Sequence, residues 1–254
     1  MEKILQLYTR PFFLLGQYIV LLLQVFTIPD KWKVFFKQLI KEIYKLGVDS
    51  LGIVWIISIF IGAVMAIQIQ LNLTNPIMPQ YILGLTTRDT LLLEFSSTIM
   101  CIILAGKVGS NIASEIGTMR ITEQIDALNI MGVNSANYLI LPKVVGLMLF
   151  TPVLVVFSMF FGIMGGYCIA IFTDLVSLSQ WEYGIQSYFK EFYVWYSIIK
   201  SVIFAFLIST IASYHGYYAE GGALDVGKAS TKSVVVSSIY ILLMDVVLTK
   251  LLLQ

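Results

Sequence analysis

Five long apolar segments constrain the fold of this chain more than any other feature of its sequence. They cover residues 51–70, 90–109, 144–172, 195–214 and 233–253. Each is long enough to span a bilayer, because a helix needs about 20 largely apolar residues to cross a hydrocarbon core of ~30 Å. The chain is 58% hydrophobic and only 12% charged, whereas soluble domains carry about 25% charged residues. We therefore predict an all-α integral membrane protein with five transmembrane helices, forming one domain over residues 1–254.

Residues 1–48 precede the first span and predict helices that enter the membrane interface without crossing it. Residues 11–28 are apolar but contain Gln17 and Gln24, and they could form an interfacial or a re-entrant helix. Asp30 is a candidate N-cap for the next helix. Over residues 31–45 an apolar stripe with aromatics runs beside a basic stripe, which is typical of a helix whose lysines contact anionic headgroups. These lysines are Lys33, Lys37, Lys41 and Lys45.

The distribution of Lys and Arg predicts the orientation, because cytoplasmic loops carry an excess of these residues. Seven precede the first span, three lie between the second and third spans, and two lie between the fourth and fifth. The opposite set holds only Arg88, Lys190, Lys200 and Lys250. We therefore expect a cytoplasmic N-terminus and a C-terminus on the far side of the membrane.

A charged segment at residues 115–128 interrupts the apolar pattern between the second and third spans. Ile121, Ile125 and Leu128 recur there at helical spacing, and charged residues occupy much of the remaining surface. The pattern predicts a short amphipathic helix over about residues 112–130, lying on the inner membrane surface. Two interpretations remain open: a docking element for a soluble partner, or a solvated connector that rests on lipid.

Two carboxylates fall inside predicted spans, where an uncompensated charge is expensive and indicates a specific role. Glu94 lies near the start of the second span and is followed by Ser97 and Thr98, so one face of that helix is polar. It could line a cavity for a lipid headgroup, or it could reach water at the outer interface. Asp245 lies deeper in the fifth span and favours a structural pairing with a hydroxyl or backbone group of a neighbouring helix.

Catalytic, metal and cofactor sites are not predicted for this chain. Residues 222–229 have the spacing of a phosphate-binding loop up to Lys228 but lack the Ser or Thr that should follow. His215 is the only histidine, so neither a histidine-based zinc site nor a Ser-His-Asp triad is supported. Cys101 and Cys168 lie in apolar stretches and are expected to be buried thiols. A net charge of +1 without a basic run gives no support to nucleic-acid binding.

Four segments of the sequence resemble the signature of MlaE-family permeases. They are residues 105–110, 115–128, 227–235 and 241–249, and the likeness covers the chain from about residue 30 onward. The resemblance implies a multi-pass permease subunit of an ABC-type (phospho)lipid transporter in the bacterial inner (cytoplasmic) membrane, with a periplasmic C-terminus. Lipid would move between this membrane and a periplasmic MCE-domain protein, driven by a separate cytoplasmic ATPase.

The resemblance also implies partners and site residues. The permease would be a homodimer that works with ABC ATPase subunits, the MCE-domain protein, membrane lipid and, in some systems, a STAS-domain subunit. ATP and Mg would be bound by the ATPase, so this chain would not itself be an enzyme. Coupling to the ATPase would involve Glu115, Gly117, Arg120, Glu123, Gln124 and Asp126. The candidates for the lipid path are Glu94, Ser97, Thr98 and Asp245.

The sequence departs from the family pattern at the start of the second span. The usual Arg-Glu-Leu-Gly-Pro stretch is Leu93-Glu94-Phe95-Ser96-Ser97 here, so its Arg and Pro are missing. Arg88 could replace that Arg only if the helix starts early enough. Two rival functions remain open: an ion-coupled secondary carrier that uses Glu94 and Asp245, and a passive membrane anchor for an MCE ring.

Overall fold

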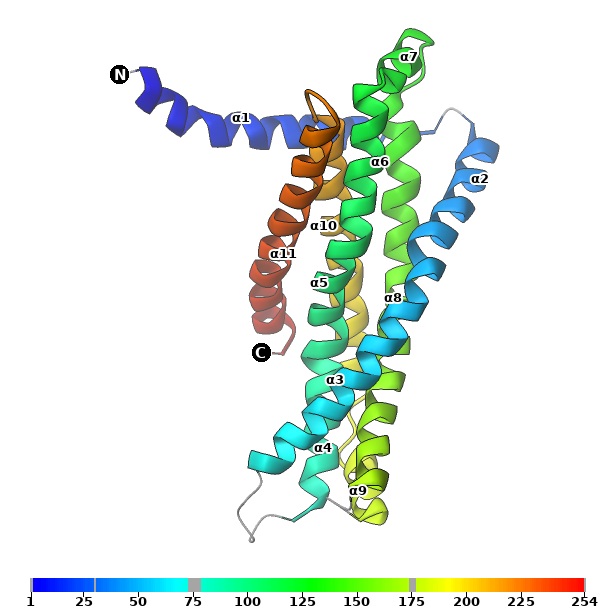
Figure 1. Ribbon diagram of the computed structural model, residues 1–254, viewed down its shortest axis with the longest axis vertical. Helices are drawn as coiled ribbons and strands as arrows, with labels where there is room; N and C mark the ends of the chain where they lie inside the picture. The colour runs from blue at the N-terminus through cyan, green and yellow to red at the C-terminus, as the bar shows by residue number, and fades with distance from the viewer. Residues whose placement is uncertain (1, 30, 73–78, 174–176, 254) are drawn as a thin grey trace. The chain divides into compact units, whose positions relative to one another are not determined.

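The computed structural model of the protein describes residues 2–29, 31–72, 79–173 and 177–253, and Asp30 lies outside these residues. The described chain is helical apart from short connections (Figure 1). Five helices are long and apolar enough to cross a membrane, and a shorter apolar helix, Phe12–Val25, precedes them. The long helices are Trp32–Asn72, Tyr81–Ile121, Ser135–Phe172, Phe192–Tyr217 and Ala223–Leu253. The predicted all-α class with five spans is thereby confirmed.

The bounds of the helices differ from the predicted spans mainly where polar residues extend them. In chain order the α-helices are α1 (Glu2–Val25), α2 (Trp32–Glu42), α3 (Leu51–Asn72), α4 (Tyr81–Thr90), α5 (Met100–Leu104), α6 (Ser110–Ile121), α7 (Gln124–Ile130), α8 (Ser135–Phe172), α9 (Leu178–Gln186), α10 (Phe192–Tyr217) and α11 (Ala223–Leu253). Segments of π-helix cover Ile43–Gly47, Leu91–Ile99 and Ala105–Gly109, and a 3-10 turn covers Val48–Ser50. These turns keep the backbone hydrogen-bonded where α-helices meet, as a lipid environment requires.

The first three of the five long helices extend well beyond the predicted spans, and the second covers Tyr81–Ile121 instead of residues 90–109. The first span is continuous with the basic segment, because no non-helical residue separates α2 from α3. The third, α8, begins at Ser135 rather than at residue 144 and has 38 residues. A helix of that length measures about 57 Å at 1.5 Å per residue, so α8 extends beyond a bilayer core of ~30 Å.

The chain divides into two compact units, each described here by itself. The first comprises Met1–Ile43, Ala105–Leu147 and Phe206–Ser238. In this unit α1 packs on α10, where the Tyr18 hydroxyl donates to Thr210 Oγ1 at 2.8 Å. Asn137 of α8 donates to the carbonyls of Val25 and Thr27 at 2.8 and 2.7 Å. These bonds satisfy carbonyl groups at the C-terminal end of α1, which have no partner within that helix.

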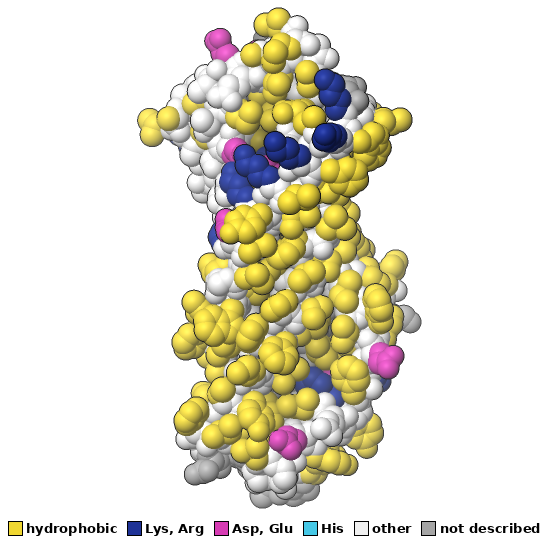
Figure 2. All heavy atoms as spheres, turned by 90° about the vertical axis from the view of Figure 1, so that its right-hand side faces the viewer, with side chains coloured by type: hydrophobic (Ala, Val, Ile, Leu, Met, Phe, Trp, Pro, Cys, Tyr) yellow, Lys and Arg dark blue, Asp and Glu magenta, His cyan; other side chains and the backbone are white. Residues whose placement is uncertain are grey.

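In the same unit α2 turns one face toward α8 and leaves the other exposed. Leu39 is buried, and a Cβ built on Gly146 would lie 3.5 Å from Leu39 Cδ1. On the exposed face, Lys33, Lys37 and Lys41 (the α2 lysines) follow one another at intervals of four residues. The neighbouring row of exposed side chains is apolar and consists of Trp32, Phe36 and Ile40. Figure 2 shows basic side chains gathered on a surface that is otherwise mostly hydrophobic.

The second unit comprises Tyr44–Leu104, Met148–Ala205 and Ile239–Gln254. Its helices α3 and α8 touch through glycines: a Cβ on Gly62 would fall on the carbonyl oxygen of Gly162, and a Cβ on Gly165 on that of Ile59. Small residues of this kind allow membrane helices to pack backbone against backbone. A buried cluster beside this contact joins α3, α4, α8 and α9 through Ala66, Leu83, Ala170 and Trp181.

Candidate functional site

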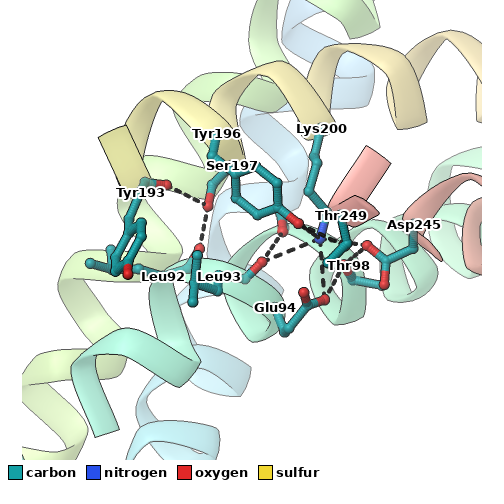
Figure 3. A network of polar contacts seen from close by, with 11 residues as sticks. Leu92, Leu93, Glu94, Thr98, Tyr193, Tyr196, Ser197, Lys200, Asp245 and Thr249 are labelled. Atoms are coloured by element: carbon teal, nitrogen blue, oxygen red, sulfur yellow. Dashed lines mark hydrogen bonds and ion pairs between the residues drawn. The ribbon is translucent and has the colours of Figure 1, made fainter. Parts of the chain in front are cut away.

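A polar network joins three helices of the second unit at the position of Glu94 (Figure 3). Lys200, on α10, has a fully buried side chain, and its nitrogen Nζ lies 3.1 Å from Glu94 Oε2 and 2.5 Å from Asp245 Oδ1. Glu94 belongs to the π-helical segment Leu91–Ile99, and Asp245 belongs to α11. Because a charge in apolar surroundings must be paired, these contacts tie the three helices together.

Hydroxyl groups complete the network around the three charges. Thr98 Oγ1 lies 2.9 Å from Asp245 Oδ1 and 3.2 Å from Glu94 Oε2, so its single proton can be donated to either carboxylate. The Tyr196 hydroxyl oxygen accepts from Lys200 Nζ at 3.2 Å. The three N–H groups of the ammonium therefore share four acceptors: two carboxylates, the Tyr196 phenol and the carbonyl of Leu93 at 3.2 Å. Two carboxylates and one ammonium give this network a formal charge of −1.

An open pocket of about 500 Å³ borders the network. The side chain of Glu94 is 39% exposed and that of Asp245 17%, whereas that of Lys200 is fully buried. The pocket can therefore offer carboxylate oxygens to a ligand, while the ammonium stays behind them. Among the described residues, no group of three or more His, Cys, Asp or Glu could hold a metal ion. The pocket is lined by Glu94, Asp245, Val246, Thr249, Lys250 and Leu253.

The structure brings together three of the four residues proposed for the lipid path: Glu94, Thr98 and Asp245. The fourth, Ser97, is buried, and its hydroxyl donates at 3.4 Å to the carbonyl of Leu93 in its own helix. Ser97 therefore satisfies its hydroxyl locally and takes no part in the network.

Lys200, the residue at the centre of the network, is not among the site residues predicted from the sequence. Charge counting assigned it to the far side of the membrane, but the structure places it inside α10 with its side chain fully buried. The signal was present in the sequence, because Lys200 falls within the fourth apolar segment. A lysine there requires a carboxylate from another span, and Glu94 and Asp245 are the two intramembrane carboxylates that the sequence offered.

Arg88 has a different role from the one considered for it. The second helix does start early, at Tyr81, and the Arg88 side chain is buried. Its guanidinium donates to the carbonyls of Ile185 and Ser187 at 2.6 and 2.7 Å, and it also pairs with Asp89. These carbonyls lie at the C-terminal end of α9, so Arg88 holds α9 against α4. Lys200, rather than Arg88, supplies the positive charge beside Glu94.

The charged segment at residues 115–128 consists of two helices instead of the single predicted one. Its first half belongs to α6, which continues the helix of the second span, and its second half belongs to α7. The break lies at Glu123, whose φ of 59° is left-handed. Ile125, which is fully buried, and an ion pair of 2.7 Å between Arg120 and Asp126 hold α7 beside the end of α6.

Two of the proposed coupling residues contact the rest of the first unit. Glu115 Oε2 lies 2.7 Å from Lys143 Nζ, and the same nitrogen lies 2.8 Å from Glu42 Oε1. Lys143 of α8 therefore links α2 to α6. A Cβ on Gly117 would lie 3.0 Å from Val226 Cγ1, so this glycine permits close packing of α6 on α11.

The exposed end of the segment, which we call the α7 tip, projects beyond these contacts. Figure 1 shows α7 past the end of α6. Ile130 is 88% exposed and Met131 68%, which is unusual for large apolar side chains at a polar loop. Two of the proposed coupling residues, Glu123 and Gln124, are also exposed here. The α7 tip consists of residues 122–124 and 127–131.

Five long apolar helices and an ion-pair network inside them define a multi-pass membrane protein. Residues 39–251 match the family described as permease MlaE. The chain is 34% identical over 242 residues to a probable ABC transporter permease protein of Rickettsia bellii, covering 93% of this chain and 91% of the relative. It is 30% identical over 215 residues to the intermembrane phospholipid transport system permease protein MlaE of Haemophilus influenzae, covering 84% and 82%. It is also 30% identical over 227 residues to the chloroplastic protein trigalactosyldiacylglycerol 1 of Arabidopsis thaliana, covering 88% and 64%. The chain belongs to the MlaE permease family.

Proposed function

We propose that this chain is the permease subunit of an ABC-type transporter that moves phospholipid between the inner membrane and an MCE-domain protein outside it. A separate cytoplasmic ATPase hydrolyses the ATP. The observation that carries this proposal is the family match over residues 39–251, which covers all or most of each span and the whole polar network. Relatives named as an ABC transporter permease and as an intermembrane phospholipid transport permease support it.

The pocket beside Glu94 and Asp245 is the proposed binding site for the lipid headgroup. Polar groups there can pair with a headgroup, while apolar side chains of the same pocket, Val246 and Leu253, can contact the glycerol and the start of the acyl chains. A mixed lining of this kind suits a ligand with one polar and one apolar end.

The α7 tip is the proposed contact with the ATPase. Its exposed Ile130 and Met131 can fill a hydrophobic pocket of the partner, and Glu123 and Gln124 border them. Glu115 and Gly117 contribute differently, because they join α6 to α8 and α11 within the unit. A displacement of the tip would then be transmitted through packed helices instead of being lost in a flexible loop.

A homodimer is part of the proposal, and the C-terminal half of α11 is its proposed interface. In the second unit this half buries Ile241 and Leu248 but leaves a broad apolar surface uncovered. A second copy of the chain would cover this surface. Its exposed residues outside the lipid pocket are Ile239, Tyr240, Leu242, Leu243, Val247 and Leu251.

Reconstitution tests the proposed function directly. The permease, purified with its ATPase, is placed in vesicles that contain a fluorescent phospholipid, and transfer to the soluble part of the MCE protein is measured. We expect the wild-type complex to transfer lipid only when ATP is present. In the Glu123→Lys variant the rate of transfer should fall at least about tenfold, which corresponds to a loss of ~1.4 kcal/mol of coupling. Glu191→Lys, an exposed charge reversal on the predicted outer side, is the matched control and should transfer normally.

The rival functions predict other results in the same experiment. A secondary carrier would move lipid along an ion or proton gradient without ATP. A passive anchor would bind the MCE protein but would transfer no lipid under either condition. Either outcome would exclude the ABC permease.

A further inference from the structure

We propose that the pocket beside Glu94 selects phospholipids whose headgroup carries an ammonium group, such as phosphatidylethanolamine, over anionic phospholipids such as phosphatidylglycerol. This inference rests on the proposed function, because it takes lipid to be the ligand. It concerns a property that the fold alone does not define, namely the charge of the preferred headgroup.

The first step is the charge of the network. Glu94 and Asp245 each contribute a formal −1 and Lys200 contributes +1, so this three-residue network carries a formal −1, and the other charged residue of the pocket lining is Lys250. A charge in apolar surroundings is costly unless it is paired. A headgroup ammonium can pair with the two carboxylates that share Lys200, whereas a headgroup without an ammonium finds only Lys250 as a charged partner.

The second step is accessibility. The Glu94 side chain is 39% exposed and that of Asp245 17%, and both line the pocket, whereas the Lys200 side chain is fully buried and absent from the lining. On the side of the network a ligand therefore meets carboxylate oxygens and not the Lys200 ammonium. Figure 3 shows both carboxylates directed at the Lys200 ammonium, and an ammonium in the pocket would be a second cation for these two groups.

The third step is the position of the phosphate. Lys250 lines the same pocket and is exposed. It follows Asp245 by five residues on α11, which separates their Cα atoms by about 7.5 Å along the helix axis at 1.5 Å per residue. An ethanolamine headgroup also carries its ammonium a short distance from its phosphate, so the ammonium can meet Asp245 while the phosphate meets Lys250. Phosphatidylglycerol offers only the phosphate.

The test captures lipid in this pocket rather than elsewhere on the protein. A photoactivatable amino acid replaces Val246, which lines the pocket, and the full-length permease is purified in nanodiscs with equal amounts of phosphatidylethanolamine and phosphatidylglycerol. Mass spectrometry then counts the two crosslinked lipids. We expect phosphatidylethanolamine to exceed phosphatidylglycerol about tenfold, a difference of ~1.4 kcal/mol.

Isosteric variants separate selection from folding. Glu94→Gln and Asp245→Asn, combined with Lys200→Met so that no buried charge is left unpaired, should bring the ratio close to one. Lys250→Gln should reduce crosslinking of both lipids and leave the ratio unchanged, and Glu191→Gln, outside the pocket, should change neither. Equal crosslinking of the two lipids in the protein changed only at position 246, or a ratio that persists in the Glu94→Gln/Asp245→Asn/Lys200→Met variant, would overturn the inference. If the transfer assay shows ATP-driven transfer but the crosslinking assay captures both lipids equally, the proposed function stands and only the headgroup selection is wrong.

Discussion

Replacing Lys200 by methionine is the most informative single perturbation of the network. Methionine fills a similar volume but removes the ammonium that contacts Glu94, Asp245 and the Tyr196 hydroxyl. The two carboxylates then face each other and Thr98 without a cation. The variant therefore tests whether this cluster is held by charge pairing or only by shape.

The size of the effect follows from the burial of each partner. Breaking a buried ion pair by removing one partner costs ~3–5 kcal/mol, because the other charge is left unpaired. Glu94 is 39% exposed, so water compensates part of this loss and the lower end, about 3 kcal/mol, is expected. For a chain of this size 1 kcal/mol shifts the melting temperature by ~2–4 °C, which gives a loss of about 6–12 °C.

Thermal unfolding of the detergent-purified permease, followed by a buried-thiol dye, measures this shift. Lys228→Met, where the side chain is 78% exposed, is the matched control and should change stability by less than ~0.5 kcal/mol. Adding Glu94→Gln and Asp245→Asn to Lys200→Met should restore most of the stability, because no buried charge then remains. A Lys200→Met protein that melts within ~2 °C of the wild type, or a triple variant as unstable as the single one, would refute this reasoning.

Two further predictions concern packing and lipid contact. Gly165→Ala should destabilise the permease by ~1–3 kcal/mol, because the added Cβ would fall on the carbonyl of Ile59. Gly106→Ala, where the added Cβ meets open space, is the control and should be tolerated. Equal melting temperatures of the two variants would contradict the contact of α3 with α8. Replacing the three α2 lysines by glutamine should reduce the stabilisation that added anionic lipid gives to the detergent-purified protein, by up to ~1 kcal/mol for each lysine. The same gain in melting temperature in wild type and variant would show that these lysines do not contact anionic headgroups.

Periodicity and composition were sufficient to predict the spans, because runs such as residues 51–70 are apolar on every face. They were insufficient for the extended ends of the helices. The segment from Tyr81 to Thr90 contains Arg88 and Asp89 and does not resemble a span, yet it is helical because the guanidinium finds its partners on α9. Such partners come from tertiary contacts, which one segment of sequence does not contain.

The candidate site was predictable only in part for a related reason. Glu94 and Asp245 stand out as carboxylates in apolar segments, but their common partner, Lys200, was treated as a loop charge. Counting charges by position assigns each residue to a side of the membrane and does not consider pairing between spans. The break at Glu123 was likewise invisible, because its left-handed backbone is not at a glycine and depends on the packing of Ile125.

Determining on which side of the membrane the α7 tip lies is the most direct test of the account, because an ATPase can act on this permease only from the cytoplasm. The permease is first freed of its own thiols by Cys101→Ser and Cys168→Ser, and a single cysteine then replaces either Ile130 or Tyr188, whose side chains are 88% and 79% exposed. Spheroplasts that express either variant are treated with a membrane-impermeant maleimide. We predict labelling at position 188 in intact spheroplasts, and at position 130 only after the membrane is opened. Labelling of position 130 from outside would contradict the account.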